Sequence, residues 1–376
     1  MLAATRTRAD WLLVGGVCIT LFVMLLVVTQ LTPYQAPTSQ PSLSFVAPTN
    51  SDQPTNPPYQ RMRLTETPKD GTAKGLLLDG ERQGQMALVN SVNPTNSHLR
   101  AGDTVIVLND TTSSADTAVF TYIDTLRLPG VFILAMLFIL AVVLISGRRG
   151  LMSVVGLLLS MLVIGWYIIP LIMHGHNAFF VALSGAYIIA TVSVLVAHGR
   201  RRRTYISIGC IYLILALIAL LAWLATWLAS LTGVSDEVAY WLSVDMKNID
   251  MQGIMVGGII IATLGVLDDV VTTQVAAVEE IHKARPEQSG YQLFRAASSV
   301  GNEHISSLVN TLALAYAGAS LPLIILTIHQ TNSLFLAVNS EYIMVEVVRT
   351  LVASLGLVMA VPLSTLAATA IYKKRP

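Results

Sequence analysis

Residues 253–281 read GIMVGGIIIATLGVLDDVVTTQVAAVEEI, and this stretch decides the class of fold. No charged residue occurs from Gly253 to Leu267. A single helix over the whole stretch would be about 43 Å long at about 1.5 Å per residue. The hydrocarbon core of a bilayer is about 30 Å thick. The stretch therefore predicts a membrane-spanning helix whose second, polar end reaches or passes the membrane surface.

The polar half of this helix carries an acidic pair, Asp268 and Asp269. Asp268 follows Gly253 by about 22 Å along the helix, which places the pair in one leaflet rather than in bulk water. Helical spacing puts Asp268, Thr272 and Glu279 on one stripe. Charges inside a membrane usually face a protein interior or a water-filled cavity. The stripe is interpreted as a cation or proton site, as a buried packing network, or as an interfacial cap.

Two later helices carry further candidate residues. Asn310 and Thr311 lie in a span over 306–328 at the same depth as the acidic pair, so we expect one aspartate to face them. Glu346 and Arg349 are three residues apart in the last span, a spacing that allows an ion pair within a helix. Pro362 lies in the middle of that span and predicts a kink, because proline removes one backbone hydrogen bond.

The whole chain contains eight long apolar runs, and 54% of its 376 residues are hydrophobic. A membrane-spanning helix needs about 20 such residues. The runs cover 11–31, 128–146, 151–173, 178–197, 204–231, 253–271, 306–328 and 345–371. Lys and Arg gather in alternate connections, which by the positive-inside rule predicts that both termini are cytoplasmic.

The remaining residues form an exterior segment between the first two runs. Residues 32–60 are rich in Pro, Ser, Thr, Gln and Asn, a composition typical of a disordered tether. Residues 61–122 contain short apolar runs separated by turn residues and predict a small β-rich module, a barrel or sandwich. The expected organisation is therefore a first helix at 1–31, a tether at 32–60, the module at 61–122 and a seven-helix domain at 123–376.

The chain resembles the YibE/F family of bacterial multispanning membrane proteins. The resemblance lies in three blocks: ATLGVLDD at 262–269 followed by EEI at 279–281; NTL, AY and GASLP within 310–322; and GLVMAVPL at 356–363. LRAGDTV at 99–105 resembles the longer, YibE-type members. The family pattern has one acidic residue where this chain has Asp268 and Asp269. The resemblance implies a shorter YibF-type member as a partner, with a homo-oligomer as the alternative.

The expected function is that of a multi-pass protein of the bacterial cytoplasmic membrane, a transporter or export component. The alternative is a non-transporting envelope assembly or interaction protein that acts through its exterior module. The net charge of +1 suggests no nucleic-acid partner. The sequence has neither the paired aspartate motifs of intramembrane proteases nor a G-x-S-x-G or H-E-x-x-H motif. We therefore expect no enzyme, no cofactor and no metal, with the lipid bilayer as the constant partner.

Overall fold

The computed structural model describes residues 59–69, 71–80, 82–90, 99–109, 119–246, 249–330 and 333–373. The described residues divide into two compact units, one within 36–144 and one within 145–376. The predicted first span at 11–31 and nearly all of the tether at 32–60 lie outside the described residues. Each unit is taken by itself below.

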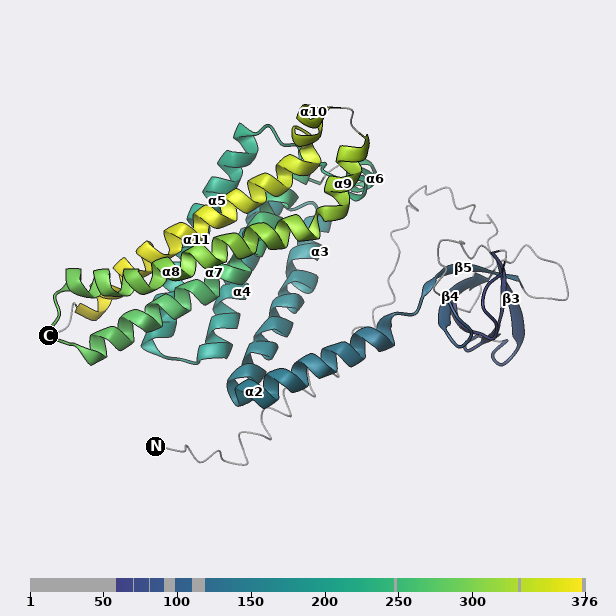
Figure 1. Ribbon diagram of the computed structural model, residues 1–376, viewed down its shortest axis with the longest axis horizontal. Helices are drawn as coiled ribbons and strands as arrows, with labels where there is room; N and C mark the ends of the chain where they lie inside the picture. Colours follow the sequence, from purple (N-terminus) through teal and green to yellow (C-terminus); the bar gives the residue numbers. More distant parts are fainter. Residues whose placement is uncertain are drawn as a thin grey trace. The chain divides into compact units, whose positions relative to one another are not determined.

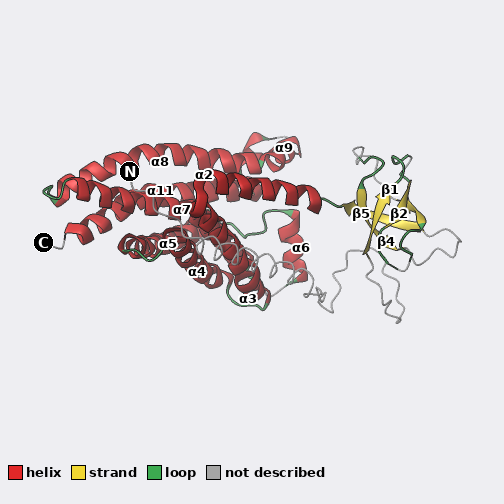
Figure 2. Cartoon of the chain, turned by 90° about the horizontal axis from the view of Figure 1, so that it is seen from below, coloured by secondary structure: helices red, strands yellow, loops and turns green. Residues whose placement is uncertain are grey.

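The N-terminal unit contains a closed barrel of five strands (Figure 2). These are β1 (Tyr59–Leu64), β2 (Ala73–Leu77), β3 (Met86–Asn90), β4 (Thr104–Asn109) and β5 (Val119–Thr125). They are ordered β1-β2-β3-β5-β4 around the barrel, and β3 and β5 pair in parallel. This is the strand order of an OB-type Greek-key barrel. The prediction of a small β-rich element in this part of the chain is confirmed.

Alternation of side chains along the strands builds the barrel core. In β1, residues alternate exposed and buried from Tyr59 to Leu64. Met62, Val89 and Val107 are completely buried, and Phe120 is nearly so. On the outside, Arg61 Nε donates a hydrogen bond to Asp79 Oδ2 at 2.7 Å. This ion pair lowers the pKa of the Asp79 carboxyl below its usual value, chiefly through the side-chain hydrogen bond from Arg61.

The described residues after the barrel, from Leu128 on, are mostly helical (Figure 1). Among the described residues, six helical segments are long and apolar enough to cross a membrane, or seven if one bent pair counts as a single span. The long helices are α2 (Leu128–Val163), α4 (Ala178–His198), α5 (Arg202–Leu228), α7 (Met251–Ala284), α8 (Gly290–Ala319) and α11 (Glu341–Lys373). Of the six candidate spans, two begin within α2, at Leu128–Arg148 and Gly150–Met173, whereas α8 is the first half of the bent pair. The shorter elements are η1 (Ile164–Ile168), α3 (Ile169–Met173), α6 (Glu237–Asp245), α9 (Leu321–Gln330) and α10 (Leu334–Val338). A multispanning helical membrane protein is confirmed at this level.

Two breaks set the boundaries of the spans. Gly147 has φ 56° and ψ −135°, so the helical run that starts at Leu128 divides into two spans there. The sequence predicted a span over 306–328, and the structure shows a bent pair of helices there. The helix starts already at Gly290, ends at Ala319, and α9 continues after a bend of 58°. Pro322 explains the restart, because proline fits the first turn of a helix but not its interior.

Helix α7 is the central element of the helical unit. It contacts α4, α5, α8 and α11, and α11 in turn contacts α5 and α8 (Figure 1). Ile259, Leu267, Val271 and Val275 of α7 are completely buried in this contact. Residues 253–281, with which the sequence analysis began, therefore belong to the helix around which the others pack.

Candidate functional site

The acidic pair of α7 is divided between an inner and an outer position. Asp268 is half-buried, whereas Asp269 is exposed. Adjacent helical residues point about 100° apart, so the two carboxylates cannot both face the same neighbour. Ser193 Oγ of α4 donates a hydrogen bond to Asp268 Oδ2 at 3.4 Å. The structure therefore distinguishes the two aspartates, which the sequence did not.

The neighbourhood of Ser193 is closely packed. A Cβ added at Gly156 would lie 3.6 Å from both Cα and Oγ of Ser193, so the second part of α2 contacts α4 at this level. Asp268 thus lies next to a small polar side chain that a third helix approaches at Gly156. Burial of a carboxylate within a span is costly, and a single long hydrogen bond from a neutral hydroxyl offsets only part of that cost.

Thr272 and Glu279, which share the predicted stripe with Asp268, have other partners. Thr272 is buried, and its Oγ1 donates to the Asp269 carbonyl at 3.3 Å. Glu279 follows Asp268 by 11 residues, about 16 Å along the helix. Its Oε1 lies 2.9 Å from Lys283 Nζ, and its Oε2 lies 3.9 Å from Arg203 Nη1 of α5. Glu279 therefore belongs to a charged cluster near the end of α7.

Asn310 and Thr311 occupy an exposed face of α8. Thr311 Oγ1 donates to the carbonyl of Ser307 in its own helix at 2.8 Å. The hydrogen bond of Asp268 goes to α4 and not to α8. A shared site of Asp268 with Asn310 and Thr311 stays a prediction.

A buried amide that the sequence analysis did not single out joins three helices. Gln274 Nε2 of α7 donates to the Ala297 carbonyl of α8 at 2.9 Å and to Thr365 Oγ1 of α11 at 2.7 Å. Gln274 is 4% exposed and Thr365 is completely buried. The spacing of Gln274 in the sequence could have indicated that it is buried. It falls in a repeat with intervals of four, three and four residues on the inner face, formed by Leu267, Val271, Gln274 and Val278.

The last span contains the other candidates. Arg349 Nη1 lies 2.6 Å from Glu346 Oε1, so the two side chains form the ion pair. Pro362 lies inside α11, which runs without a break from Glu341 to Lys373. Nearby, Thr365 Oγ1 donates to the Val361 carbonyl at 2.6 Å.

A second feature missed from the sequence is a carboxylate at the start of α11. Oε1 of Glu341 accepts hydrogen bonds from the backbone N–H groups of Thr232 and Gly233, at 2.7 and 2.8 Å. The Thr232 hydroxyl donates to the same carboxylate at 2.9 Å. The loop after α5 is thereby tied to α11 across more than 100 residues of sequence. No local pattern signals such a pairing.

The apolar helices, their packing around α7 and the carboxylate inside that helix define the chain as a multispanning membrane protein with polar groups between its spans. The model of the YibE/F-like protein family matches residues 134–374, and the chain belongs to this family. The match covers most of the helical unit and excludes the barrel. No curated protein and no solved structure matches the chain.

Proposed function

We propose that this YibE/F protein is a transporter or export component of the bacterial cytoplasmic membrane in which Asp268 exchanges a proton or a cation. The observation that carries the proposal is a half-buried carboxylate inside the central helix, hydrogen-bonded to Ser193 of a neighbouring helix. Acidic groups in such positions mark ion and proton pathways in membrane proteins. Asp269 is exposed and serves as the matched neighbour that should not matter.

The proposal includes the eight-span arrangement, with 11–31 as the first span and the barrel outside the cell. Both termini are then cytoplasmic, and Asp268 lies in the inner leaflet. Cysteine labelling tests this arrangement in a version that lacks Cys18 and Cys210. A cysteine at Ser113 should react with a membrane-impermeant reagent in intact cells, and one at Lys374 should not. Labelling at Lys374 would reverse the topology.

Proton movement tests the role of Asp268 directly. The purified protein is placed in liposomes with a pH-sensitive dye inside, and a potassium diffusion potential is applied. The parent protein should take up protons faster than empty liposomes, Asp268→Asn should lose this uptake, and Asp269→Asn should retain most of it. Uptake by Asp268→Asn equal to that of the parent would remove the main support for the transport proposal.

The exposed polar face of α8 favours a partner within the membrane. Asn302, Ser306 and Asn310 are all exposed and are spaced four residues apart, so they lie on one side of the helix. Polar side chains in a span rarely face lipid and instead contact other helices. We propose that a second copy of the chain or a shorter YibF-type protein covers this face. If the partner is a second copy, a cysteine at Asn310 should give a disulfide-linked dimer, whereas one at the exposed Leu213 of α5 should not.

The barrel supports a second candidate function, an envelope assembly or interaction role. Barrels of this strand order commonly bind extended polymers on one face and in the adjoining loops. On this reading the helical unit anchors the barrel, and deletion of the barrel should abolish the cellular phenotype while the Asp268→Asn variant remains active. The two candidate functions therefore predict opposite results for Asp268→Asn, which loses activity if the protein is a transporter and keeps it if the barrel carries the function.

A further inference from the structure

A pocket of about 440 Å³ lies between one end of α4, the middle and end of α5, and the start of α7. Its volume falls within the range of about 300–1,000 Å³ that is typical of small-molecule sites. The three helices contact one another pairwise, so the walls come from packed elements rather than from loops (Figure 1). Asp268 and Ser193 are not among the lining residues, so the pocket is separate from the proposed proton site.

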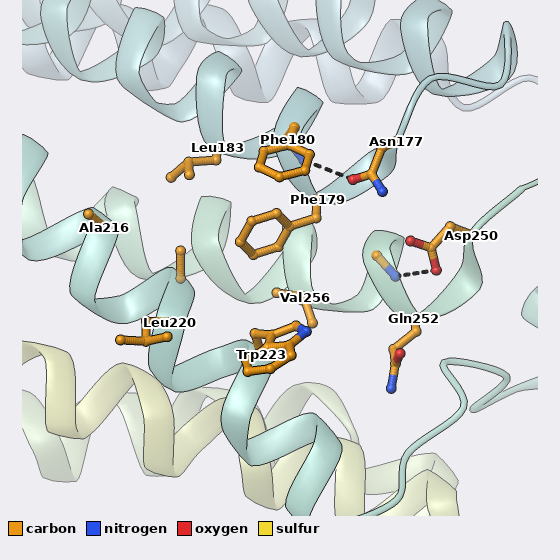
Figure 3. A pocket seen from close by; sticks show the side chains of 12 residues that line it. Asn177, Phe179, Phe180, Leu183, Ala216, Leu220, Trp223, Asp250, Gln252 and Val256 are labelled. Carbon is orange, nitrogen blue, oxygen red and sulfur yellow. Dashed lines mark hydrogen bonds between the residues drawn. The ribbon is translucent and has the colours of Figure 1, made fainter.

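One side of the pocket is apolar and aromatic. Figure 3 shows Phe179 and Trp223 directed toward the same space, with Leu183 and Leu220 on the side away from the polar residues. Phe179 comes from α4 and Trp223 from α5. Trp223 is 53% exposed, and its unburied surface is available to an occupant. Two aromatic rings on different helices can contact a flat or bulky apolar body from two sides.

The other side of the pocket is polar. Asn177 Oδ1 accepts a hydrogen bond from the Phe180 N–H at 3.2 Å, and Asp250 Oδ1 accepts one from the Gly253 N–H at 2.9 Å (Figure 3). These are the N-caps of α4 and α7, so one oxygen of each side chain is already used. Gln252 Nε2 donates to the Leu231 carbonyl at 2.9 Å. The second oxygen of Asp250 remains for an occupant.

The charge of this pocket selects the sign of its ligand. Asp250 is the only charged residue among the described residues that line it. The capping oxygens of Asn177 and Asp250 already offset part of the positive charge at the N-termini of α4 and α7, so the Asp250 carboxylate is the one full charge that the described residues place beside the pocket. Aromatic faces attract cations, and tryptophan does so most strongly. The carboxylate and the two rings therefore favour a cation with an apolar body.

We propose that this pocket binds a hydrophobic organic cation, with its apolar groups between Phe179 and Trp223 and its charge near Asp250. Ligand binding here does not depend on transport, and it can be present whether or not Asp268 carries protons. The probe of choice is tetraphenylphosphonium. Tetraphenylborate has nearly the same size and shape with the opposite charge, so it separates charge recognition from simple partitioning.

Equilibrium dialysis of the purified full-length protein in detergent, against protein-free micelles, tests the proposal. Tetraphenylphosphonium should bind saturably and tetraphenylborate should not. Asp250→Asn should weaken binding about tenfold, a change within the reach of one partly solvated charge pair. Asparagine is as good an N-cap as aspartate, so the start of α7 is kept. Asp245→Asn, an exposed change in α6 away from the pocket, should leave binding unchanged.

Three outcomes would overturn the proposal. Equal binding of the two probes would show that the pocket takes any hydrophobic molecule, including lipid. Unchanged affinity in Asp250→Asn would remove the carboxylate from recognition. An equal loss in Asp245→Asn would reduce the effect to general surface charge.

Protection from alkylation locates the bound probe without changing Asp250. In a protein without Cys18 and Cys210, a cysteine at Ala216, which lines the pocket, should react more slowly with a thiol reagent when tetraphenylphosphonium is bound. A cysteine at the exposed Tyr205, about three turns away on α5, should react at an unchanged rate. If the probe binds but protects neither position, or both equally, the binding site lies elsewhere and the proposal fails.

Discussion

The hydrogen bond between Gln274 and Thr365 should stabilise the contact between α7 and α11 measurably. The test is a double-mutant cycle with Gln274→Met and Thr365→Val, which remove the amide and the hydroxyl and roughly keep side-chain volume. The bond is 2.7 Å long and both residues are buried. Hydrogen bonds between membrane helices contribute about 0.6 kcal/mol on average and up to about 1.7 kcal/mol. This short and fully buried bond should lie in the upper half of that range.

The structure also predicts how the single changes differ. Gln274→Met loses two bonds, to Ala297 and to Thr365, and should lower the free energy of unfolding by about 1–3 kcal/mol. Thr365 keeps a bond to the Val361 carbonyl in every variant that retains its hydroxyl. Gln274→Met therefore leaves no unpaired hydroxyl on Thr365, so no penalty for an unsatisfied polar group adds to the loss of the two bonds.

Reversible unfolding in mixed micelles, followed by circular dichroism as the denaturing detergent increases, measures the cycle. Ser364→Ala replaces Thr365→Val in the control cycle, since Ser364 is equally buried and its hydroxyl bonds to the Ala360 carbonyl instead. The control coupling should be within about 0.4 kcal/mol of zero, the usual limit of additivity. A Gln274–Thr365 coupling no larger than the control would refute the reasoning.

Three further predictions concern packing, pH and the loop after α5. Gly301→Ala should destabilise the protein by about 1–3 kcal/mol, because an added Cβ collides with Val361 and Gln274. Gly318→Ala should not, because no neighbouring side chain in the described part of the chain lies near that position, and the same detergent titration compares the two variants. The pKa of Asp79 in the barrel is lowered, so its ion pair with Arg61 stabilises the fold at pH values above about 4, and this stabilisation is lost as the pH falls further. Hydrogen exchange in β1 should show a pH-dependent stabilisation of up to about 1 kcal/mol, and Asp79→Asn should lack it. Glu341→Ala should lower the free energy of unfolding by about 1 kcal/mol or more and increase proteolysis of the loop at Thr232. Unchanged proteolysis would show that the Glu341 hydrogen bonds do not hold this loop.

Much of the architecture could be predicted from local sequence because its cause is local. An apolar run of about 20 residues must span the membrane whatever its neighbours are, so the helices α4, α5, α7 and α11 fall where the runs predict them. The exposed and buried alternation of Tyr59–Leu64 likewise follows from the two-residue period of a strand. The bend within the span predicted at 306–328 could not be read from the sequence, because hydropathy does not register the restart at Pro322.

The candidate site was only half predictable. The sequence placed two acidic residues at one depth of a span, but the choice of Asp268 as the inner one depends on the rotation of α7 against α4 and Ser193. The same holds for Glu279, which shares a stripe with Asp268 yet pairs with Lys283 and approaches Arg203. A stripe on a helix fixes the direction of a side chain but not the neighbour that it meets.

By itself, the sequence determined that this is a helical membrane protein with a β-rich N-terminal element, and it identified the family through ordered blocks in the helical part. Those properties depend on the solvent that each segment requires and on periods of two or 3.6 residues. Only the tertiary structure decided that Gln274 bonds to residues 23 and 91 positions away, and that α4, α5 and α7 enclose a pocket beside Asp250. The physical reason is that hydrogen bonds and cavities depend on distances between atoms, and helix packing sets those distances for residues far apart in the chain.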